Sequence, residues 1–209
     1  MSQRILITAG PTHEPIDAVR FIGNRSSGKL GIALAREAAA RGLDVTLLLG
    51  PVCADAPAGV AVSRFRTTSE LQSLLREHGP RADVVIMAAA VADFRPKTVQ
   101  SDGKIKRAAA GLTLELEATP DLLAELGANR RAGQTLIGFA LEPRERLVES
   151  AKNKLERKRV DAIVANELET MDAETIRATV FTKTRAIDTP GMMPKDAFAL
   201  WLLDVIAGL

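Results

Sequence analysis

The sequence predicts an α/β protein with a Rossmann-like three-layer fold, a mostly parallel sheet, and a C-terminal hairpin plus helix. Short apolar runs alternate along the 209 residues with longer segments of helical periodicity, a pattern typical of βαβ units. The chain carries neither an internal repeat nor a low-complexity linker. A single domain over residues 1–209 is therefore expected.

The first strand and helix set this pattern. Residues 4–8 (RILIT) form an apolar run that ends in a turn of small residues and proline, as buried strands do. Residues 26–42 predict a helix with Ser26 and Ser27 at its N-cap and Gly42 at its end. Further strands are expected over residues 44–50, 61–67 and 82–90.

The second helix is expected over residues 68–79, with Thr68 or Ser69 as N-cap and Gly79 at its end. The remaining elements are strands over 112–117, 135–141 and 161–166, helices over 119–128, 144–159 and 194–209, and a hairpin over 178–189. Because loops gather at the carboxyl ends of parallel strands, a ligand site is expected at that edge of the sheet.

Composition excludes several classes of protein. Hydrophobic residues make up 46% and charged residues 26% of the chain, as in a globular protein. The formal net charge of +2 is too small to argue for nucleic acid or a membrane surface as partner. No apolar run approaches the length of a membrane span, and no signal-peptide pattern precedes the first strand. Cys53 is the only cysteine, which excludes an internal disulfide and predicts a cytoplasmic protein.

Residues 23–31 (GNRSSGKLG) come close to a Walker loop, in which Gly, four residues and Gly-Lys precede Ser or Thr. Leu30 stands where that hydroxyl residue is required, and the strand over 4–8 ends about fifteen residues before Gly23. A Walker loop is thus excluded. The dinucleotide-binding fingerprint is absent too, because residues 44–50 end without the acidic residue that holds the ribose.

Two interpretations of this segment remain. Serine hydroxyls, backbone N–H groups and the helix dipole favour a bound anion, and Gly28 and Gly31 would let a phosphate approach the backbone. Alternatively, Ser26 or Ser27 is an ordinary helix cap and the glycines permit close helix–sheet packing. The preceding connection, residues 10–24, is long and rich in proline and polar groups, and long structured loops tend to be functional.

Residues 7–31 resemble the opening of phosphopantothenoylcysteine synthetase (phosphopantothenate–cysteine ligase), the ligase domain of the bacterial coenzyme A biosynthesis flavoprotein family. They read ITAGPTHEPIDAVRFIGNRSSGKLG. Further motifs follow in the family's order: AAAVADFRPK (88–97), GKIKR (103–107), TPDLL (119–123), IGFALE (137–142) and KNKLERKRVDAIVAN (152–166). The resemblance covers essentially the whole chain, and its motifs are long and specific.

The resemblance implies an amide ligase acting on 4′-phosphopantothenate and L-cysteine. Family members activate the phosphopantothenate carboxylate with a nucleoside triphosphate, which gives an acyl nucleotide and pyrophosphate; the cysteine amine then displaces the nucleoside monophosphate. The bacterial type generally uses CTP and the eukaryotic type ATP, and the bacterial form of residues 152–166 favours CTP here. Mg²⁺ is expected with the triphosphate, with no protein ligand assigned to it. The resemblance also implies a homodimer with shared active sites.

The resemblance further implies roles for individual residues. Asn24 matches the catalytic asparagine beside the acyl carbonyl, and Lys104 matches the lysine that faces the developing phosphate charge. Arg20 matches an arginine offered to phosphopantothenate across the dimer. The substrate-binding set is Arg20, Asn24, Ala89, Ala90 and Asp93. The nucleotide-binding set is Ser26, Gly28, Gly31, Met87, Ala88, Ala89, Asp93, Lys104, Pro120, Asp121, Leu122, Leu123, Phe139, Lys154 and Lys158.

For some of these positions a purely structural interpretation stays open. Residues 87–90 also fit buried strand packing. Lys154 and Lys158, four residues apart, share a helical face and would also fit a solvated surface. The neighbouring charges expected to be solvated are Lys152, Arg157 and Arg159.

The chain departs from the family pattern in several respects. Gly23 replaces a serine, and one extra residue lies between Asp93 and Lys104, which leaves the register of that loop open. The flavin-binding decarboxylase half is missing from the sequence, which predicts no flavin here. Two alternatives stay open: a separate ligase, with a flavin-dependent decarboxylase as a separate partner, or a domain excised from a longer protein. Two other classes remain as alternatives: an NAD(P)-dependent Rossmann-type oxidoreductase and a catalytically silent nucleotide-binding module.

Overall fold

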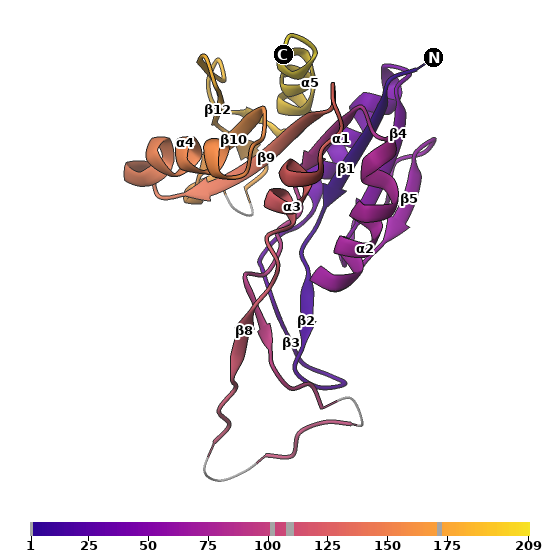
Figure 1. The fold of residues 1–209 in the computed structure, drawn as a ribbon, viewed down its shortest axis with the longest axis vertical. Coiled ribbons are helices and arrows are strands. Elements are labelled where there is room, and N and C mark those ends of the chain that lie inside the picture. Colours follow the sequence, from indigo (N-terminus) through magenta and orange to yellow (C-terminus); the bar gives the residue numbers. More distant parts are fainter. Residues whose placement is uncertain (1, 101–102, 108–110, 171–172) are drawn as a thin grey trace.

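The computed structural model describes residues 2–100, 103–107, 111–170 and 173–209. These residues form a layered body with a long arm that projects from it (Figure 1). Among them, a sheet of eight strands runs in the order β13-β12-β10-β9-β6-β1-β4-β5. Its strands are β1 (Arg4–Ala9), β4 (Asp44–Leu49), β5 (Ala61–Arg64), β6 (Val84–Met87), β9 (Thr135–Glu142), β10 (Ala162–Glu167), β12 (Ala178–Thr182) and β13 (Ala186–Asp188).

The sheet is parallel from β5 to β10 and antiparallel beyond it. Every neighbouring pair from β5 through β4, β1, β6 and β9 to β10 is parallel. The last strands, β12 and β13, form an antiparallel hairpin at one edge, and a helix follows it. The predicted mostly parallel sheet with a C-terminal hairpin and helix is confirmed.

The helices are α1 (Lys29–Ala40), α2 (Thr68–His78), α3 (Leu122–Asn129), α4 (Leu147–Arg157) and α5 (Lys195–Ala207). Short 3₁₀ segments cover Gly79–Arg81, Arg144–Arg146 and Leu168–Thr170, and a small separate ribbon joins β11 (Thr175–Ile176) to β14 (Met193–Pro194). In the part of the chain that the structure describes, no helix is long and apolar enough to cross a membrane.

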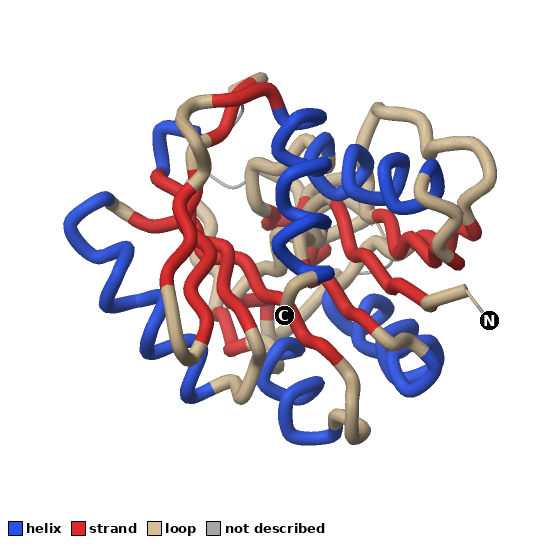
Figure 2. Tube along the Cα trace, turned by 90° about the horizontal axis from the view of Figure 1, so that it is seen from above, coloured by secondary structure: helices blue, strands red, loops and turns tan. Residues whose placement is uncertain are grey.

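The helices cover both faces of the sheet, which gives three layers (Figure 2). Helices α1 and α5 pack on one face, and α2, α3 and α4 pack on the other. Successive residues of β1 enter opposite cores: Ile5 and Ile7 face α1, and Leu6 faces the other layer. Each such fully buried side chain stabilises the fold by roughly 1.5–3 kcal/mol. Burial on both faces explains why the central strands are continuous apolar runs.

The start of α1 differs from the prediction. Its N-cap is Gly28, which has a positive φ of 70° and makes no side-chain cap hydrogen bond. Ser26 and Ser27 precede that position, so the expectation that they cap the helix was wrong. The reason is packing: a Cβ on Gly31 would lie 2.4 Å from the Ala9 Cβ, so the first turn of α1 rests directly on β1.

Helix α2 begins at Thr68, as predicted, but its N-cap is the residue before the two predicted caps. Thr67 is the N-cap; its side chain accepts from the Glu70 N–H, and the Glu70 carboxylate accepts from the Thr67 N–H. This capping box is typically worth about 1 kcal/mol. Thr68, one of the two predicted caps, is instead buried, and its hydroxyl donates to the buried Glu14 carboxylate at 2.7 Å. The Gly79 end was predicted correctly.

The arm consists of residues 12–23 and of the described residues within 93–118. It contains two ribbons, β2 (His13–Pro15) with β3 (Phe21–Gly23), and β7 (Phe94–Pro96) with β8 (Leu116–Ala118). Both ribbons leave the body together (Figure 1). The strand predicted over 112–117 begins only at Leu116, and β7 was not predicted. Neither ribbon is covered on two faces, so neither has the apolar run by which a buried strand is found.

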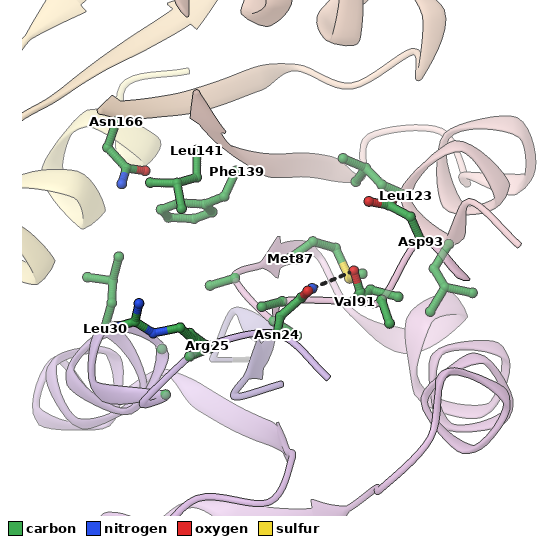
Figure 3. A pocket seen from close by; sticks show the side chains of 18 of the residues that line it. Asn24, Arg25, Leu30, Met87, Val91, Asp93, Leu123, Phe139, Leu141 and Asn166 are labelled. Carbon is green, nitrogen blue, oxygen red and sulfur yellow. Dashed lines mark hydrogen bonds between the residues drawn. The ribbon is translucent and has the colours of Figure 1, made fainter. Parts of the chain in front are cut away.

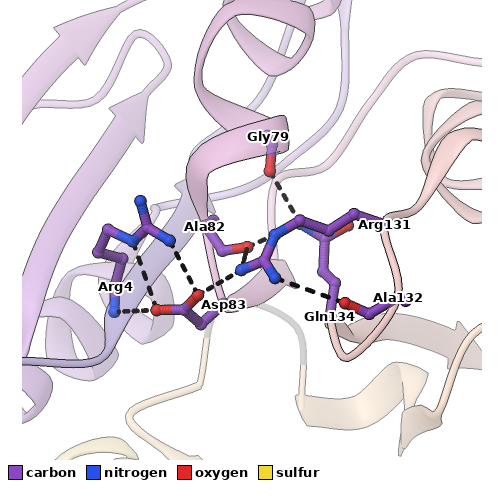
Figure 4. Close-up of polar contacts among 7 residues, drawn as sticks. All are labelled: Arg4, Gly79, Ala82, Asp83, Arg131, Ala132 and Gln134. Carbon is purple, nitrogen blue, oxygen red and sulfur yellow. Dashed lines mark hydrogen bonds and ion pairs between the residues drawn. The ribbon is translucent and has the colours of Figure 1, made fainter.

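An ion cluster lies at the amino ends of β1, β6 and β9 (Figure 4). The arm leaves the sheet from the opposite ends of the strands. The Asp83 carboxylate accepts from the Arg4 backbone N–H at 2.9 Å and from the Arg4 Nη2 at 3.1 Å, and it also pairs with Arg131. Arg131 donates to the Ala82 carbonyl at 3.0 Å. The side-chain hydrogen bond from Arg4 is the main reason that the pKa of Asp83 falls to about 2.

Candidate active site

A cavity of about 720 Å³ opens where the parallel strands end, at the edge where the sequence analysis expected a ligand. Residues that follow β6, the ends of β9 and β10, and the loop before α1 all contribute to its wall (Figure 3). Sixteen of the predicted residues line it: Asn24, Ser26, Gly28, Gly31, Met87, Ala88, Ala89, Ala90, Asp93, Pro120, Asp121, Leu122, Leu123, Phe139, Lys154 and Lys158.

Asn24 lies on the loop that returns from the arm to the body. Its Nδ2 donates a 2.9 Å hydrogen bond to the carbonyl of Val91, in the loop after β6 (Figure 3). An asparagine amide has two N–H donors and one acceptor oxygen, so this bond uses one donor and orients the other groups. Asn24 is therefore held in a defined orientation at the cavity wall.

The loop before α1 supplies a second wall. Ser26 and Ser27 line the cavity, and neither of them caps α1, so their hydroxyls are not committed to its first turn. A Cβ on Gly28 would meet Val52 at 3.0 Å, and its positive φ disfavours a larger residue as well. The close packing expected of Gly28 and Gly31 is thus confirmed. The anion-binding interpretation of residues 23–31, in which backbone N–H groups and the helix dipole face a phosphate, stays a prediction.

Two threonines that the sequence analysis missed hold the loop after β6. The Thr8 Oγ1 accepts from the Ala89 N–H at 3.0 Å, and the Thr12 Oγ1 accepts from the Ala92 N–H at 2.9 Å. Both hydroxyls are fully buried. The sequence feature that could have identified them is a hydroxyl residue at the end of an apolar strand, followed by a second one four residues later. They fix the small-residue segment against β1. Met87, which precedes it, is buried in the core and also lines the cavity.

Lys154 in α4 and Lys158, the C-cap residue of α4, both line the cavity, and each forms an ion pair with a carboxylate. The Lys154 Nζ lies 2.8 Å from the Glu142 Oε1, and this bond is the main reason that the pKa of Glu142 is lowered. The Lys158 Nζ lies 3.2 Å from the Asp121 Oδ1, and Asp121 also caps α3 through the Ala124 N–H. Only 25% of the Lys154 side chain and 15% of the Lys158 side chain is exposed, which contradicts a solvated surface for this pair.

Several other charged or polar side chains line the cavity without having been predicted. Arg157, expected to be only a solvated surface charge, is among them, although it is largely exposed. The others, besides Ser27, are Arg25, Lys29, Thr119, Asn166 and Lys195. Lys29 forms an ion pair with Glu174. Asn166 closes the 152–166 motif, which is the signal that could have identified it.

Two predicted residues lie away from this cavity. Arg20 is on the arm, where its guanidinium pairs with the buried Asp17 carboxylate. Lys104 is exposed on the same arm. Neither of them lines the cavity of its own chain. Within the described residues, no group of three or more His, Cys, Asp or Glu side chains could hold a metal ion. No protein ligand is therefore assigned to Mg²⁺.

Comparison with known proteins gives the relatives of the chain. The family model for the DNA/pantothenate metabolism flavoprotein C-terminal domain matches residues 1–209. The chain is 40% identical over 212 residues to the coenzyme A biosynthesis bifunctional protein CoaBC of Bacillus subtilis (strain 168), over 99% of this chain and 52% of that protein. It is 46% identical over 191 residues to a protein from an unknown prokaryotic organism named cysteine/cysteine sulfinic acid decarboxylase, over 89% of this chain and 53% of that protein.

The chain spans about half the length of these two relatives, so their names describe proteins of which it matches one part. A solved structure of the C-terminal domain of the coenzyme A biosynthesis bifunctional protein CoaBC is similar with a TM-score of 0.84 and 38% identity. That similarity covers 98% of this chain and 93% of the other. The family resemblance noted in the sequence is thereby confirmed. The chain belongs to the DNA/pantothenate metabolism flavoprotein C-terminal domain family.

Proposed function

We propose that residues 1–209 form one phosphopantothenate–cysteine ligase domain, which joins 4′-phosphopantothenate and L-cysteine through an acyl nucleotide during coenzyme A synthesis in the cytoplasm. One observation carries the proposal: a single cavity is lined by Asn24, by the loop before α1 and by the lysines of α4. These groups suit an acyl carbonyl, a chain of phosphates and a nucleotide, respectively. The name of the Bacillus subtilis relative supports the same pathway.

In the first step, a carboxylate oxygen of phosphopantothenate attacks the α-phosphorus, and the bond to the leaving pyrophosphate breaks. Negative charge builds up on phosphate oxygens during this step. The N–H groups at the start of α1 and the hydroxyl of Ser26 lie where they can donate to those oxygens. Mg²⁺, held chiefly by phosphate oxygens and water, would neutralise part of the charge, and Lys104 would face the remainder.

In the second step, the cysteine nitrogen attacks the acyl carbonyl carbon, the nucleoside monophosphate leaves, and the nitrogen loses a proton. The carbonyl oxygen becomes negative in the transition state. Asn24 donates one N–H to Val91 at 2.9 Å, which orients the amide so that its second N–H can donate to that oxygen. A neutral donor held in place stabilises an oxyanion without adding a charge of its own.

The nucleotide that we propose is CTP, with no flavin. Phe139 lies half-buried at the cavity wall. Lys154 and Lys158 line the same cavity, and each is held by a carboxylate. Lysines fixed in this way can contact the edge of a small pyrimidine. Specificity constants for CTP and ATP test the choice; equal values of kcat/KM for the two nucleotides would contradict it.

We also propose a homodimer with shared sites, formed through the arm. Large apolar side chains are exposed along the arm: Val19, Phe21, Phe94, Val99, Leu112 and Leu116. Exposed apolar surface of this kind typically marks an interaction site. Arg20 lies outside the cavity of its own chain, as an arginine that serves the neighbouring subunit would. A protein that is strictly monomeric by light scattering and still active would contradict the shared site.

The decisive assay of the ligase function is pyrophosphate release with phosphopantothenate, cysteine and each nucleoside triphosphate in turn. Release that depends on phosphopantothenate supports a ligase. A chain that binds nucleotide but releases no pyrophosphate would be a silent nucleotide-binding module. NAD(P)H binding in a fluorescence titration would instead favour an oxidoreductase. In that case there would be no reason to propose a flavin-dependent decarboxylase as partner.

A further inference from the structure

The turn of the arm over residues 16–20 is organised by one buried carboxylate. Asp17 is fully buried at its side chain. Its Oδ1 accepts from the Val19 N–H at 2.9 Å and from the Arg20 N–H at 2.7 Å, an arrangement typical of an Asp that closes a turn. The Ile16 backbone N–H donates to the Arg20 carbonyl at 2.8 Å. The turn is thus held by hydrogen bonds among its own residues.

The second oxygen of Asp17 joins this turn to a distant part of the chain. Oδ2 accepts from the Arg20 guanidinium, with its Nε at 2.9 Å, and from the Ile105 N–H at 3.0 Å. Arg20 in turn donates from Nη2 to the Ile105 carbonyl at 2.9 Å. The Ala18 N–H donates to the Gly103 carbonyl at 3.2 Å. The backbone of residues 103–105 is therefore held at both ends by the turn.

This carboxylate remains ionised under ordinary conditions. The hydrogen bonds from the Arg20 side chain are the main reason that the pKa of Asp17 lies well below its usual value, and the backbone N–H groups of Arg20, Val19 and Ile105 lower it further. A buried carboxylate needs such donors, since an unpaired one would be costly. Its neutral isostere, asparagine, would replace an acceptor oxygen with an N–H₂ group that faces donors.

Lys104 is the residue between the two anchor points, Gly103 and Ile105. Its position on the arm is consequently set by the same carboxylate that sets the guanidinium of Arg20. Neither cation lines the cavity of its own chain. A movement of the arm that carries Arg20 therefore carries the backbone of Lys104 with it.

We propose that Asp17 is a positioning residue that couples Arg20 to Lys104, so that one arm delivers both cations together to the active site of the partner subunit. The proposal rests on the ligase function and shared sites described above. It deepens them, because it assigns Lys104 to the partner's site rather than to that of its own chain. Asp17 itself touches neither substrate nor nucleotide in this scheme.

Mixing of inactive subunits distinguishes the two arrangements. When Arg20→Ala and Asn24→Ala chains are mixed, each mixed dimer holds one intact site, and about a quarter of wild-type activity should return with random pairing. Lys104→Gln mixed with Asn24→Ala should give the same recovery. Arg20→Ala mixed with Lys104→Gln should give none, because each site then lacks one of the two cations.

The outcomes separate this inference from the proposed function. If Arg20→Ala and Asn24→Ala fail to restore activity, the shared site itself is wrong, and this inference falls with it. If they restore activity and Arg20→Ala with Lys104→Gln restores it too, Lys104 serves its own chain's site. That result overturns the coupling and leaves the ligase function intact.

The role of Asp17 is tested with Asp17→Asn, with Glu117→Gln as the matched control, since Glu117 pairs with Arg95 on the same arm at 2.7 Å. Asp17→Asn should lower kcat/KM at least tenfold without changing dimer mass or circular dichroism, whereas Glu117→Gln should stay near wild type. Asp17→Asn mixed with Asn24→Ala should return about a quarter of wild-type activity, as Arg20→Ala does, because its defect lies on the arm that serves the partner. A dimer that dissociates, or mixed dimers that regain nothing, would make Asp17 structural and overturn its positioning role.

Discussion

The Nδ2 of Asn24 donates a 2.9 Å hydrogen bond to the backbone carbonyl of Val91. This bond joins two loops that are 67 positions apart in the chain: the one after β3, which leads into α1, and the one after β6, which buried threonines hold against β1. The Asn24 amide therefore lies between the loop before α1, which suits phosphates, and the small-residue loop after β6. Substitutions of Asn24 and Lys104 can test the roles proposed for these residues in the two steps.

Asn24→Asp should separate the two steps. The substitution removes the amide donor and places a carboxylate against the Val91 carbonyl and against the developing oxyanion. Pyrophosphate should still be released once, while the cysteine-dependent step slows by about a hundredfold or more. Quenching before and after cysteine addition, followed by mass spectrometry, should show accumulated acyl nucleotide. Asn153→Asp, at an exposed position of α4, is the charge-matched control. A variant that forms no acyl nucleotide would refute the assigned role.

Lys104→Gln should act on the first step. Removal of its ammonium leaves the charge that develops on the phosphate oxygens without this partner, so little acyl nucleotide should form even without cysteine. The same quench experiment measures it. Lys106→Gln, at an exposed neighbouring position, should behave like the wild type. Accumulation of acyl nucleotide in Lys104→Gln would mean that Lys104 and Asn24 have the opposite roles.

Lys158→Met should weaken nucleotide use. The ammonium of Lys158 is held at the cavity wall by Asp121 at 3.2 Å, so its loss removes a positioned cation and leaves the carboxylate facing the ligand. The expected drop in kcat/KM for CTP is about tenfold or more, which corresponds to ~1.4 kcal/mol. Lys152→Met tests a lysine of the same helix that is exposed and should change little. Equal effects of the two substitutions would argue for a general charge effect.

Gly31→Ala should destabilise the fold at the start of α1. The added methyl group would lie 2.4 Å from the Ala9 Cβ and 3.1 Å from the Thr8 carbonyl oxygen, so α1 must move away from β1. Overpacking of this kind typically costs about 1–3 kcal/mol. Urea denaturation measures it, with Gly191→Ala as control because nothing lies within 4 Å of a Cβ there. Nucleotide affinity should fall as well, since the anion-binding loop moves with the helix.

The Asp83 cluster should make stability depend on pH. The pKa of Asp83 falls from 3.8 to about 2 in the folded protein, chiefly through the Arg4 side chain. A depressed folded pKa means that the contribution is complete above the ordinary value and is lost as pH falls toward the folded one. Thermal melts of wild type and Asp83→Asn should therefore differ most near neutral pH and converge at about pH 2. A constant difference across that range would exclude this origin.

The sequence by itself determined the layered fold, the order of its main elements and sixteen of the residues that line one cavity. Buried strands such as β1 and β6 are apolar on both faces, and helices such as α4 are amphipathic, so local pattern was enough to find them. The cavity residues follow from long motifs that resemble a known family. Asn24, Met87 and Lys158 line the same cavity because the strand ends bring their segments together, while their roles in binding and catalysis stay predictions.

Only the tertiary structure decided what depends on contacts between distant segments. Gly28 rather than a serine caps α1 because the helix must rest on Ala9, which no local propensity records. Apart from the strand predicted over 112–117, which overlaps β8, the ribbons of the arm escaped prediction because they are open to solvent and lack the apolar run of a buried strand. The Ile105 N–H donates to Asp17, 88 positions earlier in the chain, and a hydrogen bond across that separation exists only once the chain has folded.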